Sequence, residues 1–177
     1  MTGPEPVPQS FTCTQLNSKH DLEAFDCGNE ALNRWLRQHA QHMHARRYSR
    51  VFVWTDQQMG KEVLAYFCLS ATAIRREQVQ PAARRSELAH IPAFLLGKLA
   101  LDRRLQGQGL ARVLIADAVR IAVRASESVA ARFLVVDAVD DHAASVYESC
   151  GFSRVDGMRL LARLDDLRAA VAEANHT

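Results

Sequence analysis

Two spacings of hydrophobic and polar residues occur along the chain, and each predicts a different kind of element. Residues 50–54 (RVFVW) and 63–69 (VLAYFCL) are apolar and rich in β-branched or aromatic side chains, and a polar, glycine-containing stretch separates them. This pattern predicts two antiparallel strands. Residues 93–101 (AFLLGKLAL) and 133–137 (FLVVD) predict buried strands, and Gly97 inside the first of them indicates a bulge or a close backbone approach.

A helical spacing of apolar residues begins in the N-terminal third. Leu32, Trp35, Leu36 and Met43 recur at near-helical intervals, and the positions between them are basic or amide side chains. They predict one amphipathic helix with a basic outer face. The candidates for its N-terminal cap are Asp26 and Asn29.

Strands and helices alternate in the second half. Residues 110–126 predict a helix, residues 142–150 a shorter helix ending at Gly151, and the chain from Asp165 onward a closing helix, after weak strand signals around Asp156-Gly157. The predicted core face of the first helix is Val113, Leu114, Ala118, Ile121 and Ala122. The order of elements predicts an α/β (α+β) fold, a mixed sheet with helices on both faces.

The N-terminal residues and the composition indicate how many domains to expect and what class of protein this is. Residues 1–10 contain three prolines and predict a loose tail, residues 11–177 predict a single domain, and residues 72–90 predict an irregular connection. With 48% hydrophobic and 24% charged residues the chain is typical of a globular protein. No stretch approaches the roughly 20 apolar residues of a membrane span, and the N-terminus lacks the features of a signal peptide, so we expect a cytoplasmic protein.

Charge is unevenly distributed, although the net charge is only +2. Between Ala31 and Thr55 there are five arginines and no acidic residue. Such a run is equally consistent with a solvated face and with a surface that binds polyanion phosphates, for which guanidinium groups are well suited.

Histidine and cysteine spacing gives no sign of a metal site. The histidines at 39, 42 and 44 do not share one helical face, and the four cysteines form no CxxC pair, so we expect no metal site.

The first candidate for chemistry is the glycine turn, Arg104-Leu-Gln-Gly-Gln-Gly109, between the predicted strand 93–101 and the predicted helix 110–126. Glycines at 107 and 109 let backbone N–H groups face inward, and the start of a helix adds partial positive charge. Such a turn can hold a pyrophosphate. It lacks the third glycine of a dinucleotide fingerprint and the GK[ST] of a Walker loop.

A second motif follows about forty residues later, where the strand FLVVDA leads into DHAASVYESCGF. Together the two segments resemble the cofactor motifs of the GNAT acetyltransferase superfamily, (Q/R)xxGx(G/A) and Axx(L/V/F)Yxx…GF. The resemblance implies a GNAT fold whose central sheet is splayed between its fourth and fifth strands, and acetyl-CoA as the cofactor. It implies that Tyr147 lies near the thioester sulfur and acts as the general acid. The residues that it implies for acetyl-CoA binding are Leu99, Ala100, Leu101, Arg104, Leu105, Gln106, Gly107, Gln108, Gly109, Leu110, Ala111, Ala138, Ala144 and Tyr147.

Across roughly residues 16–165 the chain further resembles the TacT-like GNAT toxins of bacterial toxin–antitoxin pairs, above all in its FDCGNEALNRWL opening. This implies acetylation of the α-amino group of aminoacyl-tRNA, which blocks translation. It also implies neutralisation by a ribbon-helix-helix antitoxin, contact with operator DNA only through that complex, and a homodimer. The basic residues expected to contact tRNA are Arg34, Arg37, Arg46, Arg47, Arg75, Arg76, Arg84, Arg85 and Lys98.

No general base stands out, because the acidic residues near the second motif, such as Asp140, are better placed to cap a helix. The α-amine of an aminoacyl ester is less basic than a lysine amine, so much of it is neutral at pH 7 and water can take its proton. Two alternatives remain open: a GNAT enzyme that acts on a small-molecule or protein amine, and a binding module that works mainly through its antitoxin and operator DNA.

Overall fold

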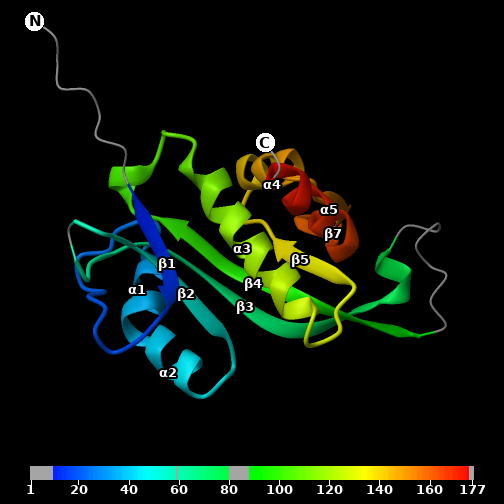
Figure 1. Ribbon diagram of the computed structural model, residues 1–177, viewed down its shortest axis with the longest axis horizontal. Coiled ribbons are helices and arrows are strands. Elements are labelled where there is room, and N and C mark those ends of the chain that lie inside the picture. Colours follow the sequence, from blue (N-terminus) through cyan, green and yellow to red (C-terminus); the bar gives the residue numbers. More distant parts are fainter. Residues whose placement is uncertain (1–9, 59, 80–87, 176–177) are drawn as a thin grey trace, which may run out of the picture.

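The computed structural model describes residues 10–58, 60–79 and 88–175, which build one mixed sheet with helices on both faces (Figure 1). The strand order is β1-β2-β3-β4-β5-β7-β6, and only β4 and β5 pair in parallel. The strands are β1 (Phe11–Gln15), β2 (Arg50–Asp56), β3 (Val63–Arg75), β4 (His90–Leu101), β5 (Phe133–Asp137), β6 (Ser153–Asp156) and β7 (Arg159–Arg163). The mixed sheet expected from the sequence is confirmed.

The helices divide between the two faces of this sheet. They are α1 (Glu30–Gln38), α2 (Ala40–Ala45), α3 (Leu110–Ser126), α4 (Asp141–Ser149) and α5 (Leu164–Ala174), with short 3-10 turns η1 (Arg76–Gln78) and η3 (Arg103–Leu105). Side chains that alternate along the strands reach opposite cores. Phe67 belongs to the core beneath α3, α4 and α5, whereas its neighbour Tyr66 belongs to the core beneath α1. The period of two along β3 therefore explains why both faces need a cover.

One predicted helix is two helices in the structure. The backbone at His39 (φ −121°, ψ −29°) interrupts the segment, so that α1 ends at Gln38 and α2 begins at Ala40. Leu36 and Ala40 are both fully buried, so the apolar spacing continues across the break. Neither glycine nor proline marks the interruption, which is why the pattern alone predicted a single helix.

The irregular connection predicted at residues 72–90 overlaps the ends of two strands in the structure. The structure extends β3 to Arg75 and begins β4 at His90, and Ile74 faces Ile91 across the ladder. Both isoleucines are 1% exposed, whereas their neighbours Ala73 and Pro92 are exposed. This alternation is the strand period, but small and polar residues on the outer face hid it.

Two further expectations were incomplete. The five-residue strand β1 was not predicted; Phe11 stacks on Trp54 with 4.8 Å between ring centroids, and this contact fixes β1 against β2. Val113 was predicted in the core, but it is 48% exposed. The buried face of α3 is turned slightly from the predicted one, and its buried residues are Leu114, Ile115, Ala118, Val119, Ala122 and Val123.

Candidate active site

The glycine turn leaves an open surface of backbone N–H groups. Gly107 and Gly109 have φ of 76° and 75°, a left-handed conformation that glycine adopts without strain. No atom outside the turn lies within 4 Å of the positions that a Cβ at either glycine would occupy. Asn29 caps α1 and Asp140 caps α4, but no side chain caps the first N–H groups of α3. Uncapped N–H groups at the positive end of a helix suit a diphosphate, so the turn fits the cofactor implied by the sequence.

The two central strands separate beside this turn. β4 and β5 pair only from Ala93 to Leu96, opposite Phe133 to Val136. The register between β3 and β4 shifts at Gly97, where the sequence predicted a bulge, and Cys68 Sγ would lie 3.4 Å from a Cβ there. Beyond the bulge, residues 98–101 continue to pair with β3 on one side only. The predicted splay is thus present, and it leaves one edge of β4 facing a cleft.

This cleft has a volume of about 600 Å³. Its lining comes from the end of β4, from Gln106 of the adjoining glycine turn, from Ala111 at the start of α3, and from the segment after β5, which is distant in sequence. The N-terminal wall, which we define as Asp26–Asn29, closes it together with Leu32 of α1. The lining residues are Cys27, Gly28, Asn29, Leu32, Leu99, Ala100, Leu101, Arg103, Gln106, Ala111, Val139 and Asp140.

The structure brings together the two predicted motifs, but the residues of the second motif that line the cleft are not the predicted ones. Ala138 and Ala144, both predicted as cofactor residues, are buried, and their neighbours Val139 and Asp140 line the cleft instead. The amide of Ala138 donates to the carbonyl of Met158 at 2.9 Å. Sequence reasoning also missed Cys27 and its neighbours as cleft residues, although the unusual FDCG opening was the signal that pointed to them.

Tyr147 lies on the buried side of α4. The residue is 7% exposed, and its ring packs edge-on against Phe152 with 5.6 Å between centroids. Its hydroxyl has no hydrogen-bond partner among the described residues. Burial, together with the nearby Cys150, raises the pKa of Tyr147 above its ordinary value of 10. The phenol therefore holds its proton throughout the neutral range, as a general acid must.

The acidic residues near the second motif are engaged within the protein. Asp140 accepts a hydrogen bond from the amide of Ala143 at 2.8 Å and caps α4, as the sequence predicted. Asp137 pairs with Arg159 at 2.7 Å, and this hydrogen bond lowers the pKa of Asp137. A lowered pKa is the opposite of what a base working near neutral pH needs, so Asp137 is not tuned for that role.

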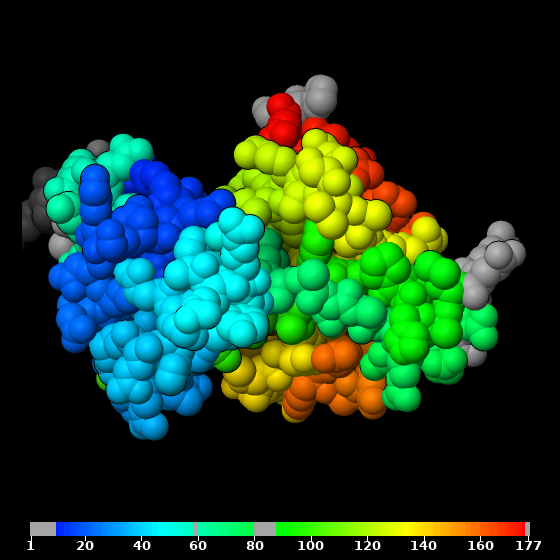
Figure 2. Space-filling model, turned by 90° about the horizontal axis from the view of Figure 1, so that it is seen from below, coloured from blue at the N-terminus to red at the C-terminus, as the bar shows by residue number. Residues whose placement is uncertain are grey.

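The predicted phosphate-binding arginines differ in how free their side chains are. Arg34, Arg46 and Arg47 are exposed and have no acidic partner in the part of the chain that the structure describes. They belong to the N-terminal segment drawn in blue to cyan in the space-filling view (Figure 2). Arg37, in contrast, donates to the carbonyl of Phe25 at 3.1 Å and pairs with Glu30 at 3.2 Å. The sequence could not distinguish these two groups.

Lys98 lies beside α1, whereas Arg75 and Arg76 lie far from it. Lys98 Nζ sits 5.1 Å from the centre of the Trp35 ring, a cation–π contact. Arg75 and Arg76 lie at the opposite end of β3 from the cleft, ten residues from the position that pairs with Leu101, about 33 Å along the strand. Arg84 and Arg85 fall outside the described residues.

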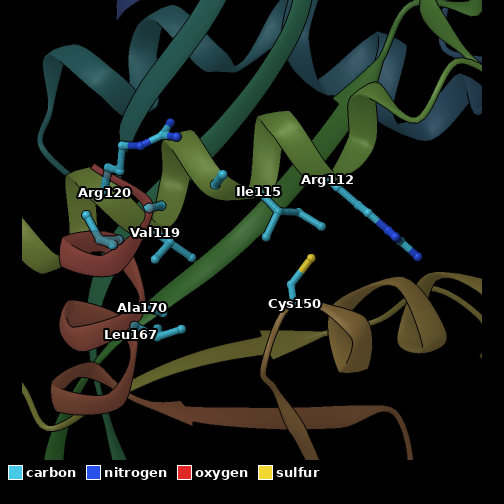
Figure 3. A pocket seen from close by; sticks show the side chains of 10 residues that line it. Arg112, Ile115, Val119, Arg120, Cys150, Leu167 and Ala170 are labelled. Atoms are coloured by element: carbon cyan, nitrogen blue, oxygen red, sulfur yellow. The ribbon is translucent and has the colours of Figure 1, made fainter. Parts of the chain in front are cut away.

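A second pocket of about 220 Å³ lies between α3 and α5 (Figure 3). Its walls are mainly apolar, with Ile115 and Val119 from α3 facing Leu167 from α5. The guanidinium of Arg112 points past its rim. The pocket shares no lining residue with the cleft, so the two are separate.

Among the described residues, no group of three or more histidine, cysteine or acidic side chains is arranged to hold a metal ion. No described helix combines the length and the apolar character needed to cross a bilayer.

Known proteins share this architecture along nearly the whole chain. A tRNA-acetylating toxin of Mycobacterium tuberculosis (strain ATCC 25618 / H37Rv) is 29% identical over 161 residues, which cover 90% of this chain and 95% of the relative. A structure of AtaT complexed with acetyl-methionyl-tRNAfMet superposes with a TM-score of 0.85 at 30% identity, covering 92% of this chain and 99% of the other. A mutant AtaT toxin bound to the C-terminus of the antitoxin AtaR and acetyl-CoA gives a TM-score of 0.78 at 29% identity, covering 91% and 98%.

Residues 21–161 match the Acetyltransferase (GNAT) domain, and this span contains the glycine turn, the splayed strands and the tyrosine helix. Acetyl-CoA is the acyl donor that the open turn and the adjoining cleft fit. On its sequence, its fold and its site, the chain belongs to the GNAT family of acetyltransferases.

Proposed function

We propose that this enzyme acetylates the α-amino group of aminoacyl-tRNA and thereby blocks translation, as the toxin of a toxin–antitoxin pair. The observation that carries the proposal is the juxtaposition of the cleft with α1, because α1 supplies Leu32 to the cleft and Arg34 to the exposed basic face. A substrate that places an amine beside the glycine turn while its phosphates lie on α1 and α2 matches this arrangement. The relatives reported above point to the same substrate class.

The residues of the glycine turn would hold the pyrophosphate through backbone N–H groups, and residues 99–101 would offer backbone groups to the pantetheine arm and the acyl carbonyl. Bound acetyl-CoA supplies an activated acetyl thioester. The Tyr147 hydroxyl holds a proton for the departing sulfur, because its raised pKa keeps it protonated. Ala138 and Ala144 would contribute through close packing near the cofactor, since their side chains are buried.

The absence of a tuned base fits an amine that is already largely neutral. Asp137 and Asp140 are committed to Arg159 and to the α4 cap, so neither is free to remove a proton. An α-amine next to an ester needs less help than a lysine amine, and water can accept its proton. This favours an aminoacyl ester over a protein lysine as the acceptor.

Several parts of the proposal concern partners. The acceptor end of the tRNA would contact Arg34, Arg46, Arg47 and Lys98. A more distant stretch of the tRNA backbone would contact Arg75 and Arg76. A small amine could not span the distance between these two groups. Arg37 would support α1, and Arg84 and Arg85 remain predicted contacts. We further propose a homodimer in the cytoplasm that is neutralised by a ribbon-helix-helix antitoxin and reaches operator DNA only through that complex.

The decisive experiment supplies labelled acetyl-CoA with charged tRNA, and separately with small amines and with a protein extract. The proposal requires that label accumulate on the amino group of the aminoacyl ester and be released with the amino acid when the ester is hydrolysed. Label found only on small amines or protein would reject the tRNA substrate. Binding of an antitoxin without any transfer would instead favour a binding module.

A further inference from the structure

A buried carboxylate stands between the cofactor turn and the N-terminal wall. Asp102 follows β4 directly and is 3% exposed. Its two oxygens accept four hydrogen bonds: from the Arg104 amide at 3.0 Å, from Arg104 Nε at 2.8 Å, from Arg104 Nη2 at 3.1 Å and from the Asp26 amide at 3.1 Å. Burial alone would raise the pKa of Asp102, but these donors outweigh it and lower the pKa below its ordinary value. The carboxylate is therefore charged and fully engaged.

Other contacts connect the same two segments. The Arg103 amide donates to the Asp26 carbonyl at 2.8 Å, and Gln106 Nε2 donates to the carbonyls of Cys27 and Leu101, each at 2.9 Å. Asp26 Oδ1 accepts from the Gly28 amide and from Asn33 Nδ2, both at 2.9 Å, so the wall has one defined shape. The wall thus rests on the turn through several polar contacts, and the Asp102 carboxylate is the one buried charge among them that binds both segments.

The Arg104 guanidinium belongs to this cluster as well. Besides Asp102, it binds Glu62 Oε1 through Nη2 at 2.7 Å. Hydrogen bonds to these two carboxylates raise the pKa of Arg104 further above its ordinary value. With its fork directed at acidic partners, the side chain fixes the backbone that starts the turn and is not free to meet a phosphate.

We propose that Asp102 is a positioning residue that couples the two halves of the site: acetyl-CoA bound at the glycine turn fixes the N-terminal wall through Asp102, and so completes the surface that receives the amine. The role of the wall in receiving the amine rests on the proposed function, whereas the coupling itself does not. Arg104 acts through Asp102 in the same way. Neither side chain touches the reacting atoms.

The test is Asp102→Asn, which keeps the shape of the side chain but replaces one accepting oxygen with a donating NH₂. Because donors surround both oxygens, the amide must oppose at least one of them. We expect the KM values for acetyl-CoA and for aminoacyl-tRNA each to rise at least about tenfold, while kcat at saturation of both substrates stays near the wild-type value. A milder variant, Arg104→Lys, keeps the charge but loses the fork, and should shift both KM values in the same direction by less.

Asp117→Asn is the matched control. Asp117 accepts from Trp54 Nε1 at 2.9 Å and from Arg120 at 2.7 Å, so the same amide replacement breaks a similar carboxylate link away from the cleft. It should lower thermal stability and leave both KM values unchanged. If both variants alter KM equally, the effect reflects general loosening and the proposal is wrong.

Hydrogen exchange supplies a readout that does not depend on the acceptor. Saturating acetyl-CoA should slow amide exchange across residues 26–33 in the wild type, and this slowing should be lost in Asp102→Asn at equally saturating acetyl-CoA, with occupancy set by calorimetry. Slowing that persists in the variant would overturn the coupling, and Arg104→Lys answers the same question if Asp102→Asn does not fold. If the wild type fails to acetylate aminoacyl-tRNA, the proposed function fails, yet the hydrogen-exchange comparison of the wild type with Asp102→Asn still decides the coupling.

Discussion

The cofactor end and the arginine-bearing face differ in how their chemistry is built. At the cofactor end, backbone conformation creates the binding surface, and side chains such as Asp102 are buried and accept several hydrogen bonds. On the α1–α2 face, Arg34, Arg46 and Arg47 project into solvent, whereas Arg37 is fixed by hydrogen bonds to the Phe25 carbonyl and Glu30.

This difference separates two kinds of recognition. A preorganised backbone turn selects a ligand by shape and distance, and it has little freedom to lose on binding. Exposed arginines attract any polyanion, and their contribution falls as salt rises. Ligand choice at the first region should therefore be strict and only weakly dependent on salt, and at the second broad and strongly dependent on salt.

The largest effect is expected from Tyr147→Phe, which removes one hydroxyl and keeps the ring against Phe152. Without the general acid, kcat should fall about 10²- to 10³-fold while the Kd for acetyl-CoA stays near wild type. Single-turnover acetylation measures the loss of rate, and calorimetry measures the Kd for acetyl-CoA.

Tyr66→Phe is the control, because the Tyr66 hydroxyl donates to the Leu32 carbonyl at 3.0 Å, and the loss of this hydrogen bond should cost about 1 kcal/mol of stability. An unchanged kcat in Tyr147→Phe would mean that water protonates the thiolate.

The salt dependence of tRNA binding probes the second region. Replacing Arg34, Arg46 and Arg47 together with alanine should weaken tRNA binding about thirtyfold at low salt and reduce the slope of log Kd against log salt by about two to three. Titrations at several salt concentrations give this slope, and acetyl-CoA binding should not change.

Arg37→Ala is the matched comparison on the same helix. Because Arg37 holds the Phe25 carbonyl and Glu30, its loss should reduce stability while the salt slope stays nearly constant. A triple variant with the wild-type slope would show that the three exposed arginines are a solvated surface, and would remove the contrast between the two regions.

Backbone shape at the cofactor end can be tested at one glycine. Gly109→Ala places a Cβ at φ 75°, which costs about 1–2 kcal/mol of strain or forces the turn to change shape. The Kd for acetyl-CoA should rise about tenfold. Gly60→Ala is matched, since Gly60 has φ 87° and open space around its Cβ position, but it lies between β2 and β3 away from the cleft. It should lose similar stability and keep cofactor affinity; equal affinities in the two variants would argue against a backbone cradle.

Much of the fold could be predicted because its signals are local. The helix 110–126 and the strand 133–137 have the bounds that their hydrophobic spacing predicted, and Gly97 marks the bulge. The break at His39 and the outer halves of β3 and β4 could not be predicted, because they depend on what lies opposite each residue. Ile74 reveals its strand only through its pairing with Ile91, which is distant in sequence.

The same distinction between local and long-range signals applies to the candidate site. The sequence identified the glycine turn and Tyr147, since motifs carry their chemistry in a short span. It did not show that Cys27 and Asn29 line the cleft, that Arg37 is paired, or that Asp102 collects four donors. The cleft joins segments that are distant in sequence, and the bond from the Asp26 amide to Asp102 spans 76 positions, so no spacing within one segment encodes either of them.

Acid stability compares a buried with an exposed carboxylate, and it affects folding and not substrate binding. The pKa of Asp102 is lowered in the folded protein, while in the unfolded chain it takes its ordinary value of 3.8. The unfolded state therefore binds the proton more readily, and the stabilisation from Asp102 is complete well above pH 3.8 and is lost as the pH falls through the folded pKa. Relative to Asp102→Asn, the wild type should be more stable by about 2 kcal/mol at pH 7, and this difference should shrink below about pH 4.

Asp137→Asn is the exposed comparison. Its effect on stability should have the same direction, since Arg159 lowers the pKa of Asp137, but a smaller amplitude, because the Asp137 side chain is 51% exposed. Urea unfolding of the three proteins between pH 3 and pH 7 measures the differences. Equal amplitudes for Asp102 and Asp137 would mean that burial adds nothing to the link between turn and wall.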